Sequence, residues 1–209
     1  MAHLIIETAV THTPAVYTHI AGLDEAGRGA LAGPVVAAAV ILPLDDPDSL
    51  DVLEEANDSK QLSAKQREAL FPVITEYALA FAVGAVPAQA IDLMGIIPAT
   101  KEAMRTAVAQ LTPSPDYLLI DGRIRLTSLN IPQQAIIRGD SQSLSIAAAS
   151  VIAKVTRDRL MVELGSQYPQ YGFAQHKGYG TEKHRQAIAE FGPCPQHRYS
   201  FSPIRQTLV

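Results

Sequence analysis

Two adjacent carboxylates, Asp24 and Glu25, follow a short apolar run in the stretch HIAGLDEAGRGALAGP. Residues 20–23 are expected to form a buried strand that ends at these acids. Carboxylates at the end of an apolar strand cost folding free energy if they are buried without a partner, so they should hold a cation or stay solvated. An isolated Asp-Glu pair is more typical of a solvated turn, but the small residues directly behind this one favour a ligand site.

Those small residues begin at Ala26 and include Gly27 and Gly29, and a single Arg28 interrupts them. Glycine has no Cβ, so a backbone built in this way can lie directly against a ligand. The Gly-Arg-Gly stretch is therefore a candidate binding loop.

Two further acids stand at predicted strand ends. Asp121 closes the run YLLID, and Asp140 follows the run IIRG. Ligand sites of α/β folds gather at such ends of the sheet. Each of these two acids, taken separately, is more typical of a turn residue or a helix N-terminal acid than of a ligand site, and spacing alone does not show that the four acids converge.

If the four carboxylates converge, their like charges must be neutralised. Hard oxygen ligands favour Mg²⁺ or Mn²⁺ over zinc, and His184 and His197 have no partner at the spacing of a zinc site. Four carboxylates can hold two cations about 3.5–4 Å apart, which activates a water and stabilises the leaving oxygen in phosphodiester hydrolysis. The chain contains neither GxxxxGK[ST] nor GxSxG, so neither a P-loop NTPase nor a typical serine hydrolase is indicated.

Strands and helices of a mixed-sheet α/β domain are predicted to position these acids. After a loose N-terminal segment and the first strand, residues 35–42 are apolar without alternation, as in a strand covered on both faces. Residues 43–58 are acidic with two prolines and are expected to form an exposed connection. Further strands are predicted at residues 79–86, 117–120 and 134–137, and helices at 64–77 (capped by Ser63), 87–94, 98–111, 144–165 (capped by Ser143) and 181–191.

The composition of the chain indicates its cellular compartment and the kinds of partner it can bind. The 209 residues suit one large domain or a domain with a small appendage. The single cysteine, the lack of a signal-like leader and a longest apolar run of about nine residues favour a cytoplasmic protein with no membrane segment. The net charge is −4, but residues 1–120 carry 6 Lys and Arg against 15 Asp and Glu, whereas residues 121–209 carry 11 against 6. This asymmetry permits a basic face on an acidic protein.

At this point the sequence resembles the ribonuclease HII family of bacterial type 2 ribonucleases H. The resemblance spans most of residues 20–203 and rests on six blocks in family-like order and spacing: GLDEAGRGALAGPVVAAAVIL, NDSKQLSAKQRE, YLLIDG, IIRGDSQSLSIAAASVIAKVTRDRLM, YPQYGFAQHKGYGTEKH and HRYSFSP.

The resemblance implies a role for each candidate residue. The family's catalytic, metal-binding acids fall on Asp24, Glu25, Asp121 and Asp140, with Asp24 bridging the cations by analogy. The Gly-Arg-Gly backbone would approach the ribose 2′-hydroxyl, which distinguishes RNA from DNA. Tyr179 would stack on the sugar beside the ribonucleotide. The implied substrate-binding residues are Gly27, Arg28, Gly29, Lys60, Lys154, Arg157 and Tyr179. Lys154 and Arg157 are expected at neighbouring surface positions of one helix, where a solvated face is the alternative.

The resemblance also implies the fold, the activity and the partners. The fold is a ribonuclease H-like α/β domain over residues 1–165, with a small helical C-terminal segment over residues 166–209 that completes the substrate groove. With two Mn²⁺ or Mg²⁺ ions, family members cut the RNA strand of RNA–DNA hybrids and incise 5′ of single ribonucleotides in duplex DNA. They leave a 3′-hydroxyl and a 5′-phosphate and are mostly monomeric.

Three of the chain's other features bear on rival interpretations. Asp158 is expected to form a salt bridge rather than act as a fifth ligand, and His197 and Arg198 to anchor the C-terminal segment. The ending RQTLV is only faintly similar to a sliding-clamp peptide and lacks the usual aromatic residues. There are two alternatives. The first is a ribonuclease HIII-like hybrid nuclease, which the Gly-Arg-Gly pattern disfavours. The second is a non-catalytic nucleic-acid-binding module, which the intact set of four acids disfavours.

Overall fold

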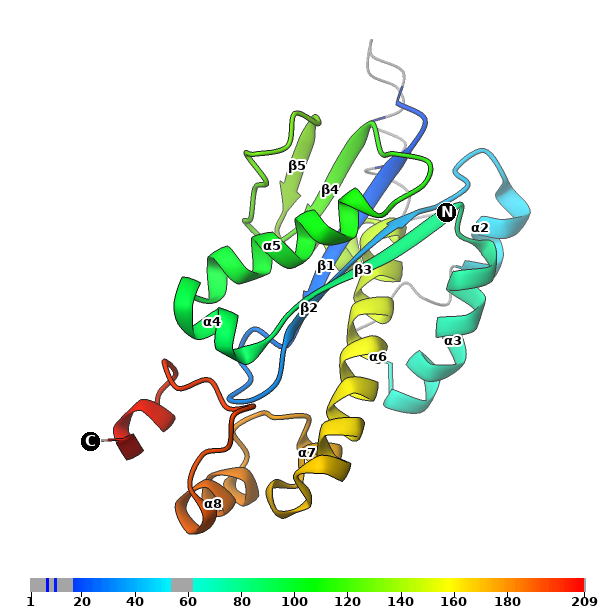
Figure 1. Cartoon of the computed structure of the whole chain (residues 1–209). Helices are drawn as coiled ribbons and strands as arrows, with labels where there is room; N and C mark the ends of the chain where they lie inside the picture. The colour runs from blue at the N-terminus through cyan, green and yellow to red at the C-terminus, as the bar shows by residue number, and fades with distance from the viewer. Residues whose placement is uncertain (1–6, 8–9, 11–16, 54–61, 209) are drawn as a thin grey trace.

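The centre of the protein is a five-stranded mixed sheet with strand order β3-β2-β1-β4-β5 (Figure 1). The computed structural model describes residues 7, 10, 17–53 and 62–208. Strand β1 pairs antiparallel with β2 and parallel with β4. Strand β3 continues the antiparallel half and β5 the parallel half. The predicted mixed α/β sheet is confirmed.

The bounds of the strands are close to those expected from hydrophobic pattern. They are β1 Ile20–Ala26, β2 Val35–Ile41, β3 Ala80–Val86, β4 Tyr117–Asp121 and β5 Gln133–Ile136. The first strand is longer than predicted, because Asp24 and Glu25 still pair with Ala38 and Ala37 of β2. The two acids therefore lie within a strand rather than in the turn after it.

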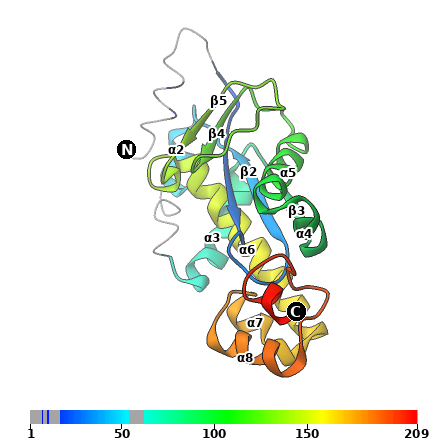
Figure 2. The ribbon, with the colours of Figure 1, turned by 90° about the vertical axis from the view of Figure 1, so that its left-hand side faces the viewer.

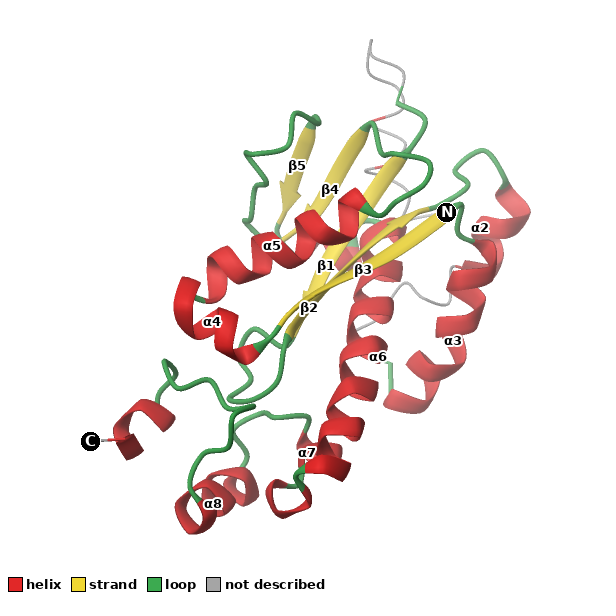
Figure 3. Ribbon diagram, viewed as in Figure 1, coloured by secondary structure: helices red, strands yellow, loops and turns green. Residues whose placement is uncertain are grey.

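Helices cover both faces of the sheet, as Figures 2 and 3 show. They are α2 Pro47–Leu53, α3 Ala64–Tyr77, α4 Ala88–Met94, α5 Ile96–Ala109, α6 Leu144–Gln167, α7 Phe173–His176 and α8 Glu182–Phe191, with short 3-10 helices at Gly139–Ser141, Pro169–Tyr171 and Ile204–Leu208. Helices α4 and α5 pack on one face and α3 and α6 on the other, so β2, which lies between them, is buried along its whole length. None of the described helices is both long enough and apolar enough to cross a bilayer.

Two capped helices confirm local predictions. Ser63 accepts a hydrogen bond from the Gln66 amide and completes a capping box at the start of α3. Ser143 accepts from the Ile146 amide at the start of α6. A Cβ on Gly22 would lie 2.1 Å from the Ser145 carbonyl carbon, so this glycine lets the first turn of α6 lie directly on β1.

The expected exposed connection at residues 43–58 is wrong in its middle part. Residues 47–53 form α2, and its Leu50 and Leu53 are buried in the core beneath α3 and α6. The Ser49 hydroxyl donates to the Asp46 carboxylate at 2.6 Å just before the helix. The acidic residues that suggested an exposed loop thus suit a helix N-terminus. Residues 54–58 lie outside the described part of the chain.

The segment before β1 is also not loose at Glu7 and Val10, two of its described positions. Val10 is buried, and Glu7 is 1% exposed. The Glu7 carboxylate accepts from the Ser143 hydroxyl at 2.5 Å and from the Ser145 amide at 3.1 Å. An anion here is favoured by the N-terminal end of the α6 dipole, although burial raises the pKa of Glu7.

The C-terminal part forms a small helical module at one end of the sheet (Figure 2). Its core packs Tyr171 and Phe173 against Met161 of α6 and Ala32 of the β1–β2 loop. Helix α6 runs through residue 165 without a break, so a single rod joins the module to the sheet domain.

Candidate functional site

Asp24 and Asp121 lie at neighbouring positions of the two parallel strands β1 and β4. The register pairs Leu23 of β1 with Ile120 of β4, and the next residues in each strand are the two aspartates. Adjacent strands are about 4.8 Å apart, so the two carboxylates lie within strong electrostatic range. The sheet itself therefore brings these two predicted acids together.

Asp24 is a buried acid that has two other acids close to it. It is 7% exposed, and burial together with the charges of Glu25 and Asp121 raises its pKa well above the usual value. The Glu25 amide, which donates at 2.7 Å, and the Ser150 hydroxyl of α6 offset part of this cost. A buried acid pressed by like charges is a site that a cation would stabilise.

Glu25 follows Asp24 directly in β1, and both residues line the same hollow. Its carboxylate forms an ion pair with Arg28 at 2.9 Å. This guanidinium lies three residues further along, within the Gly-Arg-Gly loop. The loop thus supplies a cation to one of the acids.

Asp140 lies beside Asp121 rather than at a strand end. It follows β5 by four residues in the 3-10 helix Gly139–Ser141 and is 4% exposed. The Gly139 amide donates to Asp121 Oδ1 at 2.7 Å, which ties the two acidic segments together. Asp140 does not line the hollow that Asp24, Glu25 and Asp121 share.

The donor set fits divalent cations in chemistry but is not arranged as a finished metal site. Within the described residues, no three His, Cys, Asp or Glu side chains are grouped in a way that could hold a metal ion. The reasons are visible: Glu25 is paired with Arg28, and Asp121 accepts from Gly139. A cation beside Asp24 would offset the burial and the like charges of Glu25 and Asp121 that raise its pKa.

The acids open into a hollow of about 430 Å³. The Gly27–Gly29 loop forms one wall and Tyr179 of the C-terminal module another. The lining residues are Asp24, Glu25, Ala26, Gly27, Arg28, Gly29, Arg67, Asp121, Ser150, Lys154 and Tyr179. Residues from both halves of the chain therefore meet in one cavity with carboxylates at its floor.

The two glycines of the loop serve different purposes. Gly27 has φ +93°, and a Cβ there would lie 1.9 Å from Arg157 Nε. A Cβ on Gly29 would meet nothing within 4 Å. Gly27 is thus required by the fold, whereas Gly29 leaves backbone open to whatever enters the hollow.

Arg157 and Arg198, both 0% exposed, hold this loop in place from below. Arg157 donates to the carbonyls of Ala32, Pro34 and Lys177 at 2.9–3.1 Å. Arg198 donates to Gly33 O and, at 2.9 Å, to Arg28 O. Because a trans peptide points its carbonyl and amide in opposite directions, fixing Arg28 O directs the Gly29 N–H away from Arg198.

Tyr179 stands above the same buried cation. Its ring is 37% exposed, with the Arg157 guanidinium carbon 5.4 Å and Lys154 Nζ 5.7 Å from the ring centroid. Its carbonyl accepts from the Thr181 amide at 2.8 Å and contacts His184 Nδ1 at 2.9 Å. One face of a fixed aromatic ring is thereby presented to the cavity.

Comparison of the sequence with known protein families shows to which family this chain belongs. The model for "Ribonuclease HII" matches residues 21–204. The chain belongs to the ribonuclease HII family. It is therefore a nuclease of the ribonuclease H class, a family that acts on RNA–DNA substrates. The ribonuclease HII of Chloroflexus aurantiacus is 52% identical over 193 residues, which cover 92% of this chain and 91% of that protein.

Solved structures confirm the ribonuclease H-like fold. Ribonuclease H2 of Pyrococcus horikoshii superposes with a TM-score of 0.75 at 26% identity, covering 90% of this chain and 95% of that one. The ribonuclease HII in a complex with PCNA from Archaeoglobus fulgidus gives a TM-score of 0.74 at 28% identity, over 88% and 95% of the two chains.

The structure corrects the expected role of Arg157. It was expected on the surface of α6 beside Lys154, facing phosphates, but it is fully buried and its donors are used by backbone carbonyls. Lys154 does line the hollow, in an ion pair with Asp158 at 2.6 Å. The salt-bridge role predicted for Asp158 is confirmed. Lys60 lies outside the described residues.

The histidines are also better partnered than their spacing suggested. His184 Nε2 lies 3.0 Å from His197 Nε2, so each ring is the other's partner. Both rings are buried in the C-terminal module, where His197 also contacts Cys194. The predicted anchoring role of His197 and Arg198 is confirmed.

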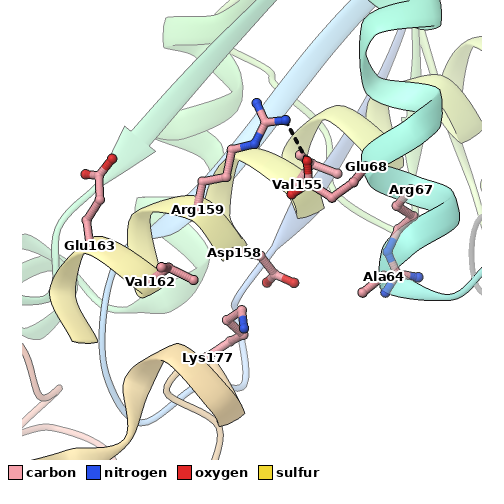
Figure 4. A pocket seen from close by; sticks show the side chains of 9 residues that line it. All are labelled: Ala64, Arg67, Glu68, Val155, Asp158, Arg159, Val162, Glu163 and Lys177. Atoms are coloured by element: carbon pink, nitrogen blue, oxygen red, sulfur yellow. Dashed lines mark hydrogen bonds and ion pairs between the residues drawn. The ribbon is translucent and has the colours of Figure 1, made fainter. Parts of the chain in front are cut away.

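Sequence reasoning did not predict the polar residues Arg67 and Ser150 as part of the hollow. Both lie inside blocks that carry the family resemblance, which was the available signal. Arg67 also borders a second hollow of about 420 Å³ between α3, α6 and α7 (Figure 4). That hollow contains no residue of the Gly-Arg-Gly loop and none of the four acids.

Proposed function

We propose that the protein is a divalent-metal-dependent endoribonuclease that cuts the RNA strand of RNA–DNA hybrids and incises duplex DNA 5′ of single embedded ribonucleotides. Its product ends are a 3′-hydroxyl and a 5′-phosphate. The observation that carries this proposal is the shared hollow in which Asp24 and Asp121 face the open Gly29 backbone and the ring of Tyr179. Removal of ribonucleotides and RNA primers from DNA, in the cytoplasm, is the corresponding role.

Asp24, Glu25, Asp121 and Asp140 would hold two Mn²⁺ or Mg²⁺ ions. When bound, such a pair activates a water and stabilises the leaving oxygen of an in-line displacement. In the net reaction the water oxygen bonds to phosphorus and the bond from phosphorus to the 3′-oxygen breaks. That oxygen takes up a proton.

The protein residues supply substrate choice. The Gly29 backbone approaches the ribose 2′-hydroxyl, the group that distinguishes RNA from DNA. Tyr179 stacks on the neighbouring sugar, while Arg28 and Lys154 supply positive charge at the same wall. Gly27 keeps the loop in this shape over Arg157.

This assignment gives the two parts of the chain separate tasks. Residues 1–165 carry the acids, and residues 166–209 carry Tyr179 and complete the substrate groove. We propose this division as functional, acting within a monomer. A sliding clamp is a further proposed partner; PCNA is the partner of the A. fulgidus protein, but the RQTLV ending of this chain contains no aromatic residue.

The test uses a labelled DNA duplex with one ribonucleotide and a long RNA–DNA hybrid, each with Mn²⁺ or Mg²⁺. Wild-type protein should make one nick 5′ of the ribonucleotide, and EDTA or Asp121→Asn should abolish it. Glu102→Gln, which removes a carboxylate paired with Arg105 on α5, is the matched control and should cut normally.

Each other outcome has a distinct meaning. If the protein cuts hybrids but makes no nick at the single ribonucleotide, Gly29 and Tyr179 do not recognise that ribonucleotide, whereas the proposed catalytic role of the carboxylates stands. Binding of both substrates without any cutting would overturn the enzyme assignment in favour of a nucleic-acid-binding module.

A further inference from the structure

A third hollow, of about 440 Å³, opens beside the acid site and is lined by basic side chains. It lies between the first turns of α5, the loop after β4 and the end of the β5 segment. We call it the basic groove, and the lining residues used below are Arg28, Ile97, Lys101, Arg123, Arg125 and Ile137.

The charge of the basic groove is one-sided. Four of its lining residues are Lys or Arg and none is Asp or Glu. The whole chain carries a net charge of −4, so this hollow departs from the average surface. Grooves lined by one sign of charge concentrate the field and attract ligands of the opposite sign.

The hollow of Figure 4 provides the contrast. Its three cations, Arg67, Arg159 and Lys177, are matched by three carboxylates, Glu68, Asp158 and Glu163. Arg159 and Glu68 form an ion pair at 2.6 Å. A polyanion would gain little there, because its contacts with the cations are offset by like-charge repulsion from the acids.

The basic groove is continuous with the acid site. Arg28 lines both hollows, and the loop that supplies Arg123 and Arg125 begins directly after Asp121. A strand whose scissile phosphate lies over Asp24 and Asp121 can therefore pass Arg28, which is paired with Glu25, to reach Lys101, Arg123 and Arg125.

Apolar side chains complete the groove. Ile97 is 42% exposed and Ile137 is 57% exposed. Nucleic-acid backbones present phosphates to Arg and Lys, with sugars between them. The presence of both basic and isoleucine side chains in the groove suits that chemistry better than a small anion.

We propose that the basic groove binds the phosphodiester backbone of the substrate duplex on one side of the cut, with Lys101, Arg123 and Arg125 each neutralising phosphate charge. This inference rests on the proposed function for the placement of the scissile bond. It makes the groove the part of the surface that sets how far the duplex must extend on that side.

The experiment measures the affinity for a fluorescent DNA duplex containing one ribonucleotide, in EDTA, over a range of salt concentrations. Lys101→Gln, Arg123→Gln and Arg125→Gln are tested singly and together. Each replacement should weaken binding and reduce the slope of log Kd against log salt by about one. Arg159→Gln, in the charge-balanced hollow, is the matched control and should leave the slope and the nicking activity unchanged.

Geometry is tested with duplexes shortened on one side of the ribonucleotide at a time. Shortening on the groove side should weaken wild-type binding and have little effect on the triple variant, whereas shortening on the other side should weaken both alike. An unchanged salt slope in the triple variant, or equal sensitivity of both proteins to each shortening, would overturn the proposal.

The outcomes separate this inference from the proposed function. If the wild-type protein nicks at the ribonucleotide but the groove variants have the same slope of log Kd against log salt, only the proposed role of the groove is refuted. If the groove variants reduce the slope but the wild-type protein does not nick at the ribonucleotide, the proposed function is refuted and the role of the groove in binding stands. Circular dichroism of the single variants, whose Arg123 and Arg125 side chains are exposed, excludes misfolding as the cause.

Discussion

The Nε2 atoms of His184 and His197 lie 3.0 Å apart, and their other ring nitrogens fix which of them carries the proton. The Cys194 amide donates to His197 Nδ1 at 2.9 Å, so His197 must be protonated at Nε2 and donates to His184. His184 is then protonated at Nδ1 and donates to the Tyr179 carbonyl at 2.9 Å. Two neutral rings thus connect the C-terminal segment to the backbone of Tyr179.

Nitrogen-15 NMR at neutral pH should show these two tautomers, Nδ1-protonated for His184 and Nε2-protonated for His197. A His197→Gln variant should disturb the resonances of Tyr179, because the ordered connection to its carbonyl is lost. Finding the opposite tautomers in the wild-type protein would contradict this arrangement.

Acid should destabilise the fold through the same pair. Burial lowers the pKa of both His184 and His197 to about 4. In the unfolded chain a histidine has a pKa of about 6.5, so between these values the unfolded state binds more protons, and the free energy of unfolding falls as the pH is lowered. Between about pH 7 and pH 4.5, the melting temperature of the wild-type protein should fall more steeply with decreasing pH than that of His197→Gln. Equal pH dependence of the two melting temperatures would contradict this prediction.

The two loop glycines should respond differently to alanine. Gly29→Ala meets open space, so the variant should melt like the wild type and lose nicking at a single ribonucleotide. Gly27→Ala places a methyl group against Arg157 at positive φ and should cost about 1–3 kcal/mol of stability. Normal nicking by Gly29→Ala would show that this backbone does not contact the substrate.

Arg157 should matter for stability more than Lys154 does. Arg157→Met removes the donor to one buried carbonyl, that of Ala32, and to two partly buried ones, and losing a partner in a buried place costs about 1–3 kcal/mol. Lys154→Gln removes a partly exposed ion pair worth less than about 1 kcal/mol. Urea unfolding of the two variants compares these costs directly, and equal midpoints would contradict the buried role.

Neutralising Asp24 should stabilise the protein while abolishing its activity. The pKa of Asp24 is raised by burial and by neighbouring acids, so its contribution to folding worsens as the pH rises above the unfolded-state value of about 3.9. Asp24→Asn should therefore raise the melting temperature at pH 7, by about 2–4 °C for each kcal/mol relieved.

Added cation should reproduce that stabilisation in the wild-type protein. Mn²⁺ or Mg²⁺ binds the native state, so it should raise the wild-type melting temperature in a concentration-dependent way. The Asp24→Asn variant should respond much less, and an equal response in both proteins would place the cation elsewhere.

The sequence predicted those parts of the fold that depend on local signals. Ser63 and Ser143 mark helix starts by side-chain hydrogen bonds that span three residues, and the apolar run of β2 reports a strand covered on both faces. Asp24 and Asp121 could be paired in advance only through the family resemblance, since their proximity is a property of the β1–β4 register.

Features that depend on distant residues could not be predicted in this way. Arg157 belongs to a residue type that is rarely buried, and only the packing of the β1–β2 loop explains its position. His184 and His197 lie 13 residues apart with no periodic signal. The basic groove collects side chains from four separate segments.

Arg198 is synthesised long after the loop that its side chain supports. Its acceptors on Gly33 and Arg28 lie 165 and 170 residues earlier in the chain. Because chains fold from the N-terminus as they are synthesised, the ribosome delivers all four acids before it delivers the guanidinium that fixes the Gly-Arg-Gly loop. The nascent polypeptide therefore acquires its carboxylates earlier than the support on which their selectivity depends.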